Sequence, residues 1–198
     1  RLQPEPIHFM PLLQGEPWHY RRRVRLSVLL DSKNRKLNIG LRRKNSQQII
    51  PIEHCLVLEQ PLNDLLPKLT ALFEQWTTPQ QLGHIELVAA DNGIAMLLRH
   101  IKNIGETDRT LLLRFAEQHQ LMLFVQEHDS IEHWYGEQPY YRLGDDITLQ
   151  FDIRDFIQIN AQLNRQMIAT ALDWLALNSQ DHVLDLFCGM GNFTLPLS

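Results

Sequence analysis

The carboxyl-terminal part of the chain carries the segment Val183-Leu-Asp-Leu-Phe-Cys-Gly-Met-Gly-Asn-Phe193. The apolar run from His182 to Phe187 is typical of a short buried strand. Gly189 and Gly191 follow it, and glycine allows backbone conformations and a close approach that a Cβ would block. In open α/β sheets, nucleotide-like ligands bind at such turns, at the carboxyl ends of the strands. The segment therefore predicts the beginning of an α/β domain with a ligand-binding turn.

The spacing of the glycines argues against two common nucleotide cofactors. Thr194 stands where a dinucleotide-binding fingerprint has its third glycine, and the turn lacks a P-loop lysine. A ligand without a pyrophosphate, such as S-adenosylmethionine, fits this turn better than NAD or ATP. Spacing alone leaves open the alternative of a purely structural strand-to-helix turn.

A helix is predicted just before this strand. Asn160 or Asn164 can cap it. Its apolar stripe consists of Met167, Ile168, Ala171, Leu172 and Leu175. One parallel strand cannot form a sheet alone, because its edges and faces need neighbours. We therefore expect residues 151–198 to be the truncated start of an α/β, Rossmann-like domain, and the chain to be a fragment of a longer protein.

Residues 1–150 have the pattern of an α+β domain. Helical spacing of apolar residues predicts amphipathic helices over residues 62–76 and 107–119. The turn sequence Asp91-Asn-Gly93 predicts a hairpin formed by residues 84–89 and 94–98. Further strands are predicted at residues 20–30, 36–42, 47–52, 121–125, 140–142 and 147–151.

Basic residues are concentrated in one stretch, although the net charge is −4. Residues 21–44 contain ten of the 19 Lys and Arg residues but only one of the 23 acidic residues. They should lie on the exposed face and tip of an antiparallel ribbon, where a positive field suits RNA phosphates; a solvated charged face is the alternative. Trp18 could add stacking. The candidate RNA-binding residues are Tyr20, Arg21, Arg22, Arg23, Arg25, Arg42, Arg43 and Lys44.

Several stretches resemble the RNA uracil-5-methyltransferase family, and most of all its members that act on 23S ribosomal RNA. Asp185-Leu-Phe-Cys-Gly-Met-Gly-Asn-Phe193 resembles the first cofactor motif of that family. Asp155-Phe-Ile-Gln-Ile-Asn160 resembles the stretch ahead of the methyltransferase sheet. Trp18-His-Tyr-Arg-Arg-Arg-Val-Arg25 resembles the start of the central domain, and the similarity includes Leu82-Gly-His-Ile-Glu-Leu-Val88. The resemblance thus covers nearly the whole chain.

The resemblance implies that the parent protein forms 5-methyluridine in 23S ribosomal RNA with S-adenosylmethionine as methyl donor. Residues 1–150 would be its RNA-contacting central domain, and residues 151–198 the start of a class I methyltransferase domain. In such enzymes a cysteine thiolate adds to carbon 6 of a flipped-out uracil, and carbon 5 accepts the methyl group from S-adenosylmethionine. A base then removes the carbon 5 proton, and elimination frees the cysteine. The family's nucleophile and base lie beyond the first cofactor motif. We therefore expect no catalytic residue in this chain and no activity of the chain alone.

The same resemblance assigns candidate ligand contacts. The candidate cofactor-binding residues are Gln158, Asp185, Phe187, Gly189, Gly191 and Asn192. Gln158 is also placed to touch the target uracil. Other roles stay open: Phe187 as a core residue, Asn192 as a helix cap, and Asp185 as an acceptor for loop amides.

The two cysteines receive different interpretations. By resemblance, Cys55 is the single downstream ligand of a [4Fe-4S] cluster whose other three cysteines lie upstream in the parent protein. The chain contains no such trio, so we expect Cys55 to be a free thiol and the cluster not to assemble here. Cys188 is interpreted as a small, packed residue at a strand end rather than as a nucleophile.

Other classes of protein receive little support. No stretch approaches the roughly 20 apolar residues of a membrane span, and residues 1–10 lack the apolar core of a signal peptide. We expect a soluble, cytoplasmic parent that is monomeric and does not bind membranes. His128 and His133, with their acidic neighbours, do not have the spacing of a zinc site and are interpreted as a solvated loop.

Two further hypotheses differ in function. The chain could belong to a non-catalytic RNA-binding module with a degenerate cofactor loop. It could also belong to another S-adenosylmethionine-dependent enzyme, such as a uracil-5-methyltransferase acting on transfer RNA or an enzyme acting on small molecules.

Overall fold

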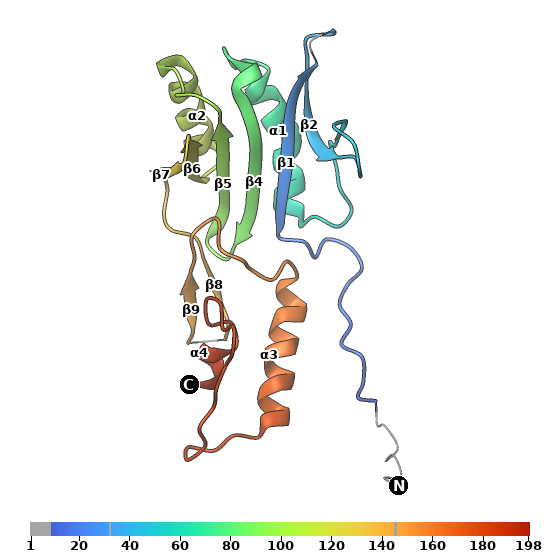
Figure 1. Cartoon of the computed structure of the whole chain (residues 1–198), viewed down its shortest axis with the longest axis vertical. Coiled ribbons are helices and arrows are strands. Elements are labelled where there is room, and N and C mark those ends of the chain that lie inside the picture. Colours follow the sequence, from blue (N-terminus) through green and yellow to red (C-terminus); the bar gives the residue numbers. More distant parts are fainter. Residues whose placement is uncertain (1–8, 32, 145) are drawn as a thin grey trace.

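A mixed seven-stranded sheet forms the larger part of the molecule, as the computed structural model shows for residues 9–31, 33–144 and 146–198 (Figure 1). The strand order is β3-β2-β1-β4-β5-β6-β7, and only the β5–β6 pair is parallel within this described sheet. The strands are β1 (Arg23–Asp31), β2 (Lys36–Arg42), β3 (Ile49–Pro51), β4 (Leu82–Ala90), β5 (Gly93–His100), β6 (Met122–Glu127) and β7 (Ser130–Tyr135).

One face of the sheet is covered by α1 (Gln60–Phe73) and α2 (Glu106–Gln118) (Figure 1). A short 3₁₀ turn, Pro79–Gln81, leads from α1 toward β4. Leu26 of β1, Leu62 of α1 and Leu112 of α2 are completely buried in the core between the two layers. Buried and more exposed side chains alternate along most of β1, because every second side chain faces the helices.

The opposite face of the sheet carries a second core. It is built by a separate two-stranded sheet, β8 (Tyr140–Arg142) with β9 (Thr148–Gln150), and by α3 (Ala161–Leu175). Its buried members are Val88, Ala95, Leu97, Met122 and Phe124 from the large sheet, and Tyr141, Leu143, Phe151, Ile153, Ile157 and Ile168 from the later segment. Residues on both sides of position 150 share this core, and the division into domains at that position stays a prediction.

Most predicted elements are present. The helices predicted over 62–76 and 107–119 correspond to α1 and α2, and the hairpin around Asp91-Asn-Gly93 is β4–β5. The predicted cap of α3 is Asn160, whose side-chain oxygen accepts a hydrogen bond from the Leu163 N–H at 2.9 Å. No helix in the described part of the chain is long and apolar enough to cross a membrane.

The strand predicted from His182 to Phe187 is wrong for this chain. The segment is irregular, and Leu184, Leu186 and Phe187 are largely exposed. A strand needs a neighbour to satisfy its N–H and C=O groups, and no described strand lies beside this segment. The short helix α4 (Thr194–Leu197) follows the glycine turn.

The loop predicted around His128 and His133 is partly wrong, since residues 130–135 form the edge strand β7. The His133 ring stacks on Phe124 with 4.5 Å between ring centroids. The Arg109 guanidinium lies 4.4 Å from the centre of the Trp134 ring, which ties α2 to β7. Within the described ranges, no group of three or more His, Cys, Asp or Glu side chains is arranged to hold a metal ion.

Candidate functional site

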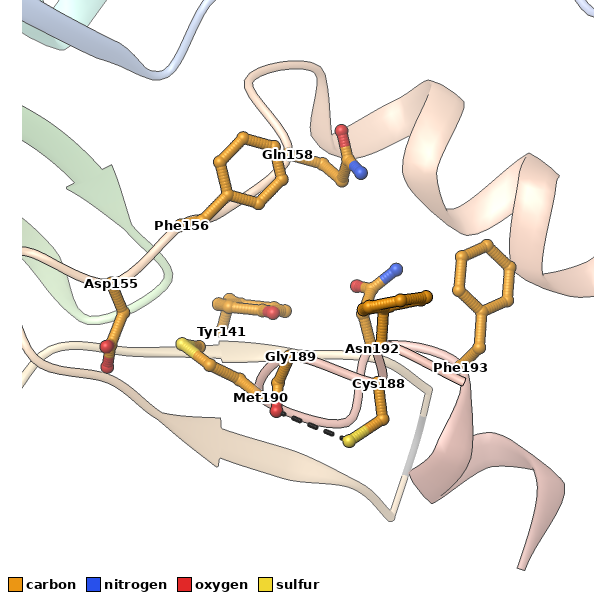
Figure 2. Close-up of a pocket in the computed structure, with 10 residues that line it drawn as sticks. Tyr141, Asp155, Phe156, Gln158, Cys188, Gly189, Met190, Asn192 and Phe193 are labelled. Atoms are coloured by element: carbon orange, nitrogen blue, oxygen red, sulfur yellow. Dashed lines mark hydrogen bonds between the residues drawn. The ribbon is translucent and has the colours of Figure 1, made fainter. Parts of the chain in front are cut away.

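A cleft of about 450 Å³ lies between β8, the segment of residues 155–158 and the glycine turn. This volume is within the usual range of small-molecule sites. Figure 2 shows Phe156 and Gln158 on one side, with Tyr141, Met190 and Asn192 across from them. The lining residues are Tyr141, Asp155, Phe156, Gln158, Phe187, Cys188, Gly189, Met190, Asn192 and Phe193.

Four of the six candidate cofactor-binding residues line this cleft, namely Gln158, Phe187, Gly189 and Asn192. The other two, Asp185 and Gly191, support the turn instead. The Asp185 carboxylate accepts a hydrogen bond from the Thr194 hydroxyl at 2.6 Å. The sequence thus predicted a group of neighbours, but not which members face the cleft.

The turn requires a left-handed backbone at both glycines. The φ angle is +57° at Gly189 and +90° at Gly191, and L side chains rarely adopt this region. A Cβ on Gly191 would also lie 3.1 Å from Leu195 Cγ. Space beside Gly189 is open, since a Cβ there would meet nothing within 4 Å. The two glycines therefore bend the chain at the mouth of the cleft.

Asn192 does not cap the following helix, so that alternative role is wrong. Its amide nitrogen donates to Asn164 Oδ1 at 2.9 Å, and its oxygen accepts from Asn164 Nδ2 at 2.8 Å. Asn164 belongs to α3 and is buried. The pairing uses one N–H and one lone pair of Asn192, so one of each stays available to a ligand.

Two residues near the predicted strand lie elsewhere than expected. Phe187 is fully exposed, so the alternative of a core residue is wrong here. Cys188 is exposed rather than packed, and its Sγ lies 3.7 Å from the Gly189 carbonyl oxygen (Figure 2). Both differences have one cause, because the strand that would bury these side chains does not form.

Tyr141 and Phe156 line the cleft but are not among the predicted site residues. Phe156 is 78% exposed and precedes the buried Ile157, so period-2 alternation places Phe156 and Gln158 on the same side of the chain. That signal was available in the Asp155–Asn160 motif. Tyr141 had no comparable signal, because tertiary packing of β8 brings it to the cleft.

The predicted basic residues separate into exposed and internal groups. Arg25, Arg42, Arg43 and Lys44 are exposed, and Arg21 and Tyr20 are partly buried. The start of β1 and the end of β2 lie at the same end of the ribbon, because the two strands are antiparallel. The exposed Arg25, Arg42, Arg43 and Lys44 therefore lie at the base of the ribbon and not at its tip.

Two arginines are used inside the protein. Arg22 is only 3% exposed, so its expected place on the exposed basic surface is wrong. Arg23 Nη2 donates to the Ile153 carbonyl oxygen at 2.8 Å and to Glu86 Oε2 at 2.9 Å, and its Nη1 donates to the Asp155 carbonyl oxygen. Arg23 thus ties β1 to the segment that leads into the cleft.

A shallow basic pocket of about 390 Å³ adjoins this network. Arg21, Arg23, Arg25 and Arg154 line it, and Glu86 is its only acidic lining residue within the described chain. Arg154 lines this pocket and the adjacent Asp155 lines the cleft, so the two hollows are neighbours at this segment. A polyanion bound over the pocket would therefore pass close to the cleft.

Comparison with known proteins identifies the family. A family model described as tRNA (Uracil-5-)-methyltransferase matches residues 7–198. The chain belongs to this family.

A relative from Haemophilus influenzae (strain 86-028NP), named 23S rRNA (uracil(1939)-C(5))-methyltransferase RlmD, is 61% identical over 198 residues. A protein of the same name from Pasteurella multocida (strain Pm70) is 62% identical over the same length. In both comparisons all of this chain matches 45% of the relative, so the chain spans less than half the length of these relatives.

A solved structure shares the fold. The crystal structure of Pyrococcus abyssi tRNA (uracil-54, C5)-methyltransferase in complex with S-adenosyl-L-homocysteine superposes with a TM-score of 0.70 and 18% sequence identity. The match covers 92% of this chain and 47% of that chain. The predicted fold class is confirmed: an α+β region that leads into the start of a Rossmann-like domain.

Cys55 of this uracil-5-methyltransferase family member lies in a tightly held loop. Its backbone N–H donates to Asn63 Oδ1 at 2.9 Å, and the Asn63 amide donates to the carbonyl oxygens of Cys55 and Leu58 at 3.0 Å. Asn63 is buried on α1, whereas Cys55 is half-buried. The loop conformation is therefore determined by the helix, and the half-buried Cys55 packs against the core.

The contacts of Glu86 with His84 and Arg23 predict a pH dependence of stability. The His84 ring, whose Nε2 lies 3.5 Å from Glu86 Oε1, and Arg23 lower the pKa of Glu86 from 4.5 to about 2. A lowered carboxyl pKa stabilises the fold above the unfolded value, and this contribution disappears as the pH falls from about 4.5 to 2.

We expect Glu86→Gln to flatten that part of the pH profile, and to lower the free energy of unfolding at pH 7 by about 2–3 kcal/mol. Urea unfolding from pH 2 to pH 7 measures both effects. Glu137→Gln, at an exposed glutamate, is the matched control and should leave the profile unchanged. Parallel profiles for Glu86→Gln and the wild type would contradict the assignment.

Proposed function

We propose that the protein containing this chain is an S-adenosylmethionine-dependent methyltransferase that forms 5-methyluridine in 23S ribosomal RNA. The observation that carries the proposal is the identity of 61–62% over all 198 residues with relatives named for this reaction. We propose the uridine that corresponds to position 1939 in those names as the target. The substrate in turn suggests a cytoplasmic protein; a monomeric state stays a prediction.

The cleft has features that suit the methyl donor. Its volume of about 450 Å³ is ample for a nucleoside-sized group, and the glycine turn leaves open space beside Gly189. The amides of Gln158 and Asn192 supply hydrogen-bond donors and acceptors. When bound, S-adenosylmethionine supplies the methyl group.

The same cleft offers contacts for a nucleobase out of its stack. Phe156 presents an exposed ring beside Gln158 (Figure 2). Aromatic side chains bind splayed bases by stacking, and amides recognise their edges by hydrogen bonding. We propose that Phe156 stacks on a base and that the Gln158 amide contacts the uracil or the cofactor.

We propose the exposed basic residues as the RNA-contacting surface. Arg25, Arg42, Arg43 and Lys44 have the charge to neutralise phosphates, and Arg154 extends this surface toward the cleft. In this scheme residues 1–150 form the RNA-contacting domain, and residues 151–198 begin the methyltransferase domain. Arg22 is buried and is not part of this surface, whereas Arg23 lines the basic pocket and also holds the segment that leads into the cleft.

Transfer RNA is the second candidate substrate. The family description and the name of the Pyrococcus abyssi protein both refer to transfer RNA. That protein is 18% identical to this chain, whereas the 23S-named relatives are 61–62% identical. The higher identity favours 23S ribosomal RNA.

Cys55 is proposed as one ligand of a [4Fe-4S] cluster in the full-length protein. The described residues offer a single cysteine at this loop and no cluster of three ligands, so they do not fit a complete site. We expect iron and acid-labile sulfide in the full-length protein purified without oxygen. Cys55→Ser should reduce the content of both, and Cys188→Ser should not. Equal iron content in the wild type and Cys55→Ser would contradict the proposal.

The reaction is tested with the full-length protein and a strain that lacks its gene. RNA from that strain should lack 5-methyluridine at the proposed 23S position, and the purified protein should transfer labelled methyl groups to its 23S RNA. Gln158→Ala should lower kcat/KM by about 10- to 100-fold, because a cleft contact is lost. The control Gln75→Ala removes an exposed amide on the other side of the sheet.

Two outcomes would contradict the proposal. Methylation of transfer RNA alone would assign the second substrate. RNA binding without methyl transfer to either RNA would assign the non-catalytic module. The 198-residue chain by itself is expected to show no turnover in the same assay.

The basic surface is tested by the salt dependence of binding. Arg42→Gln combined with Arg43→Gln should weaken RNA binding and reduce the slope of log K against log salt by about 0.7 to 0.9 per lost phosphate contact. Filter binding over a series of salt concentrations measures the slope. Lys68→Gln combined with Arg114→Gln, on the helical face, is the control of equal charge. Equal slopes for the two double variants would contradict the assigned surface.

A further inference from the structure

Arg22 joins the large sheet to the wall of the cleft through its backbone. Its N–H donates to the Ile159 carbonyl oxygen at 2.9 Å, and its own carbonyl oxygen accepts from the Ala89 N–H at 2.8 Å. Ala89 belongs to β4, whereas Ile159 directly follows the cleft residue Gln158. The chain at Arg22 therefore holds the sheet and the cleft segment at a set separation.

The Arg22 side chain contacts two residues that line the cleft. Its Nε–H donates to the Gln158 carbonyl oxygen at 2.9 Å. Its guanidinium carbon lies 4.7 Å from the centre of the Tyr141 ring. Figure 2 shows both Gln158 and Tyr141 in the cleft wall, although Arg22 itself does not line the cleft. One side chain thus contacts the cleft wall from behind at two points.

The charge of Arg22 is costly at this place. The side chain is only 3% exposed, and none of the ion pairs within 4 Å in the described chain includes it. Burial lowers the pKa of Arg22, and the more distant Asp91 and Glu59 partly oppose this effect. Tyr141, Asp91, Glu59 and Arg165 are the titratable groups that face it. Burial of a cation without a close ionic partner costs free energy, so an arginine at this position indicates a function that an apolar residue could not perform.

The shape of the guanidinium group supplies such a role. Its planar edge can donate to a carbonyl oxygen while its face lies over an aromatic ring, whereas the compact lysine ammonium has no planar face to stack on the ring. We propose that Arg22 is a positioning residue, which sets Gln158 and Tyr141 for ligand binding in the cleft. This inference rests on the proposed function and extends it to a residue outside the ligand contacts.

The test compares Arg22→Lys and Arg22→Met with the wild type in the full-length protein. Arg22→Lys keeps the charge, and Arg22→Met keeps most of the packing volume. We expect each to lower kcat/KM for RNA methylation by about tenfold or more, mainly through KM, because a displaced contact weakens binding. Thermal unfolding identifies any variant that fails to fold.

A double-mutant cycle separates positioning from general stability. If Arg22 acts through Gln158, Arg22→Lys should lower kcat/KM for RNA methylation by less than about threefold in a Gln158→Ala background. The amide that Arg22 positions is already absent from that variant. Full additivity of the two substitutions would overturn the proposal. Arg109→Lys is the matched control, since it removes another arginine–aromatic contact, with Trp134, far from the cleft.

Hydrogen exchange gives a readout that does not need turnover. Arg22→Lys should speed exchange in residues 153–160 of the full-length protein, and Arg109→Lys should not. Unchanged exchange in this segment would overturn the positioning role even if the wild type is active. Faster exchange with an inactive wild type would support the positioning role and contradict the proposed reaction, so the two failures are distinguishable.

Discussion

The architecture of the site depends on the hydrophobic packing of the later chain against the far face of the sheet. Phe151, Ile153 and Ile157 are buried against Leu97, Phe124 and their neighbours. Removing this much apolar surface from water is the main force that holds the segment in place. Because Ile157 is buried, the flanking Phe156 and Gln158 point away from the core and into the cleft. The cleft is thus a consequence of one short alternating segment.

Hydrogen bonds from two arginines fix the orientation of the packed segment. Arg23 donates to the carbonyl oxygens of Ile153 and Asp155, and Arg22 donates to that of Gln158. These carbonyl groups belong to irregular chain and lie outside the strand ladders of the described residues. Side chains from the start of β1 satisfy them. Two positions of the basic stretch, Arg22 and Arg23, therefore have an internal function.

The glycine turn forms the other wall of the cleft, and the segment that leads into it packs poorly against the rest of the protein. Its approach, residues 182–187, has exposed apolar side chains and no strand partner in the described chain. The reciprocal amide pair of Asn164 and Asn192 connects the turn to α3. Met190 and Phe193 add contacts with the second core. The turn is held mainly through α3 rather than through a sheet.

Local residue patterns were sufficient to predict most helices and strands and the family. Periodicity predicted both helices of the central region and most strands, the Asp91-Asn-Gly93 turn predicted its hairpin, and the Asp185–Phe193 motif pointed to the methyltransferase family. These features depend on residues close together in the chain. Tertiary structure alone decided that Arg22 is buried, that Tyr141 lines the cleft, and that residues 182–187 form no strand. Each of these depends on a partner distant in sequence, or on the lack of one in the described residues, which local periodicity does not encode.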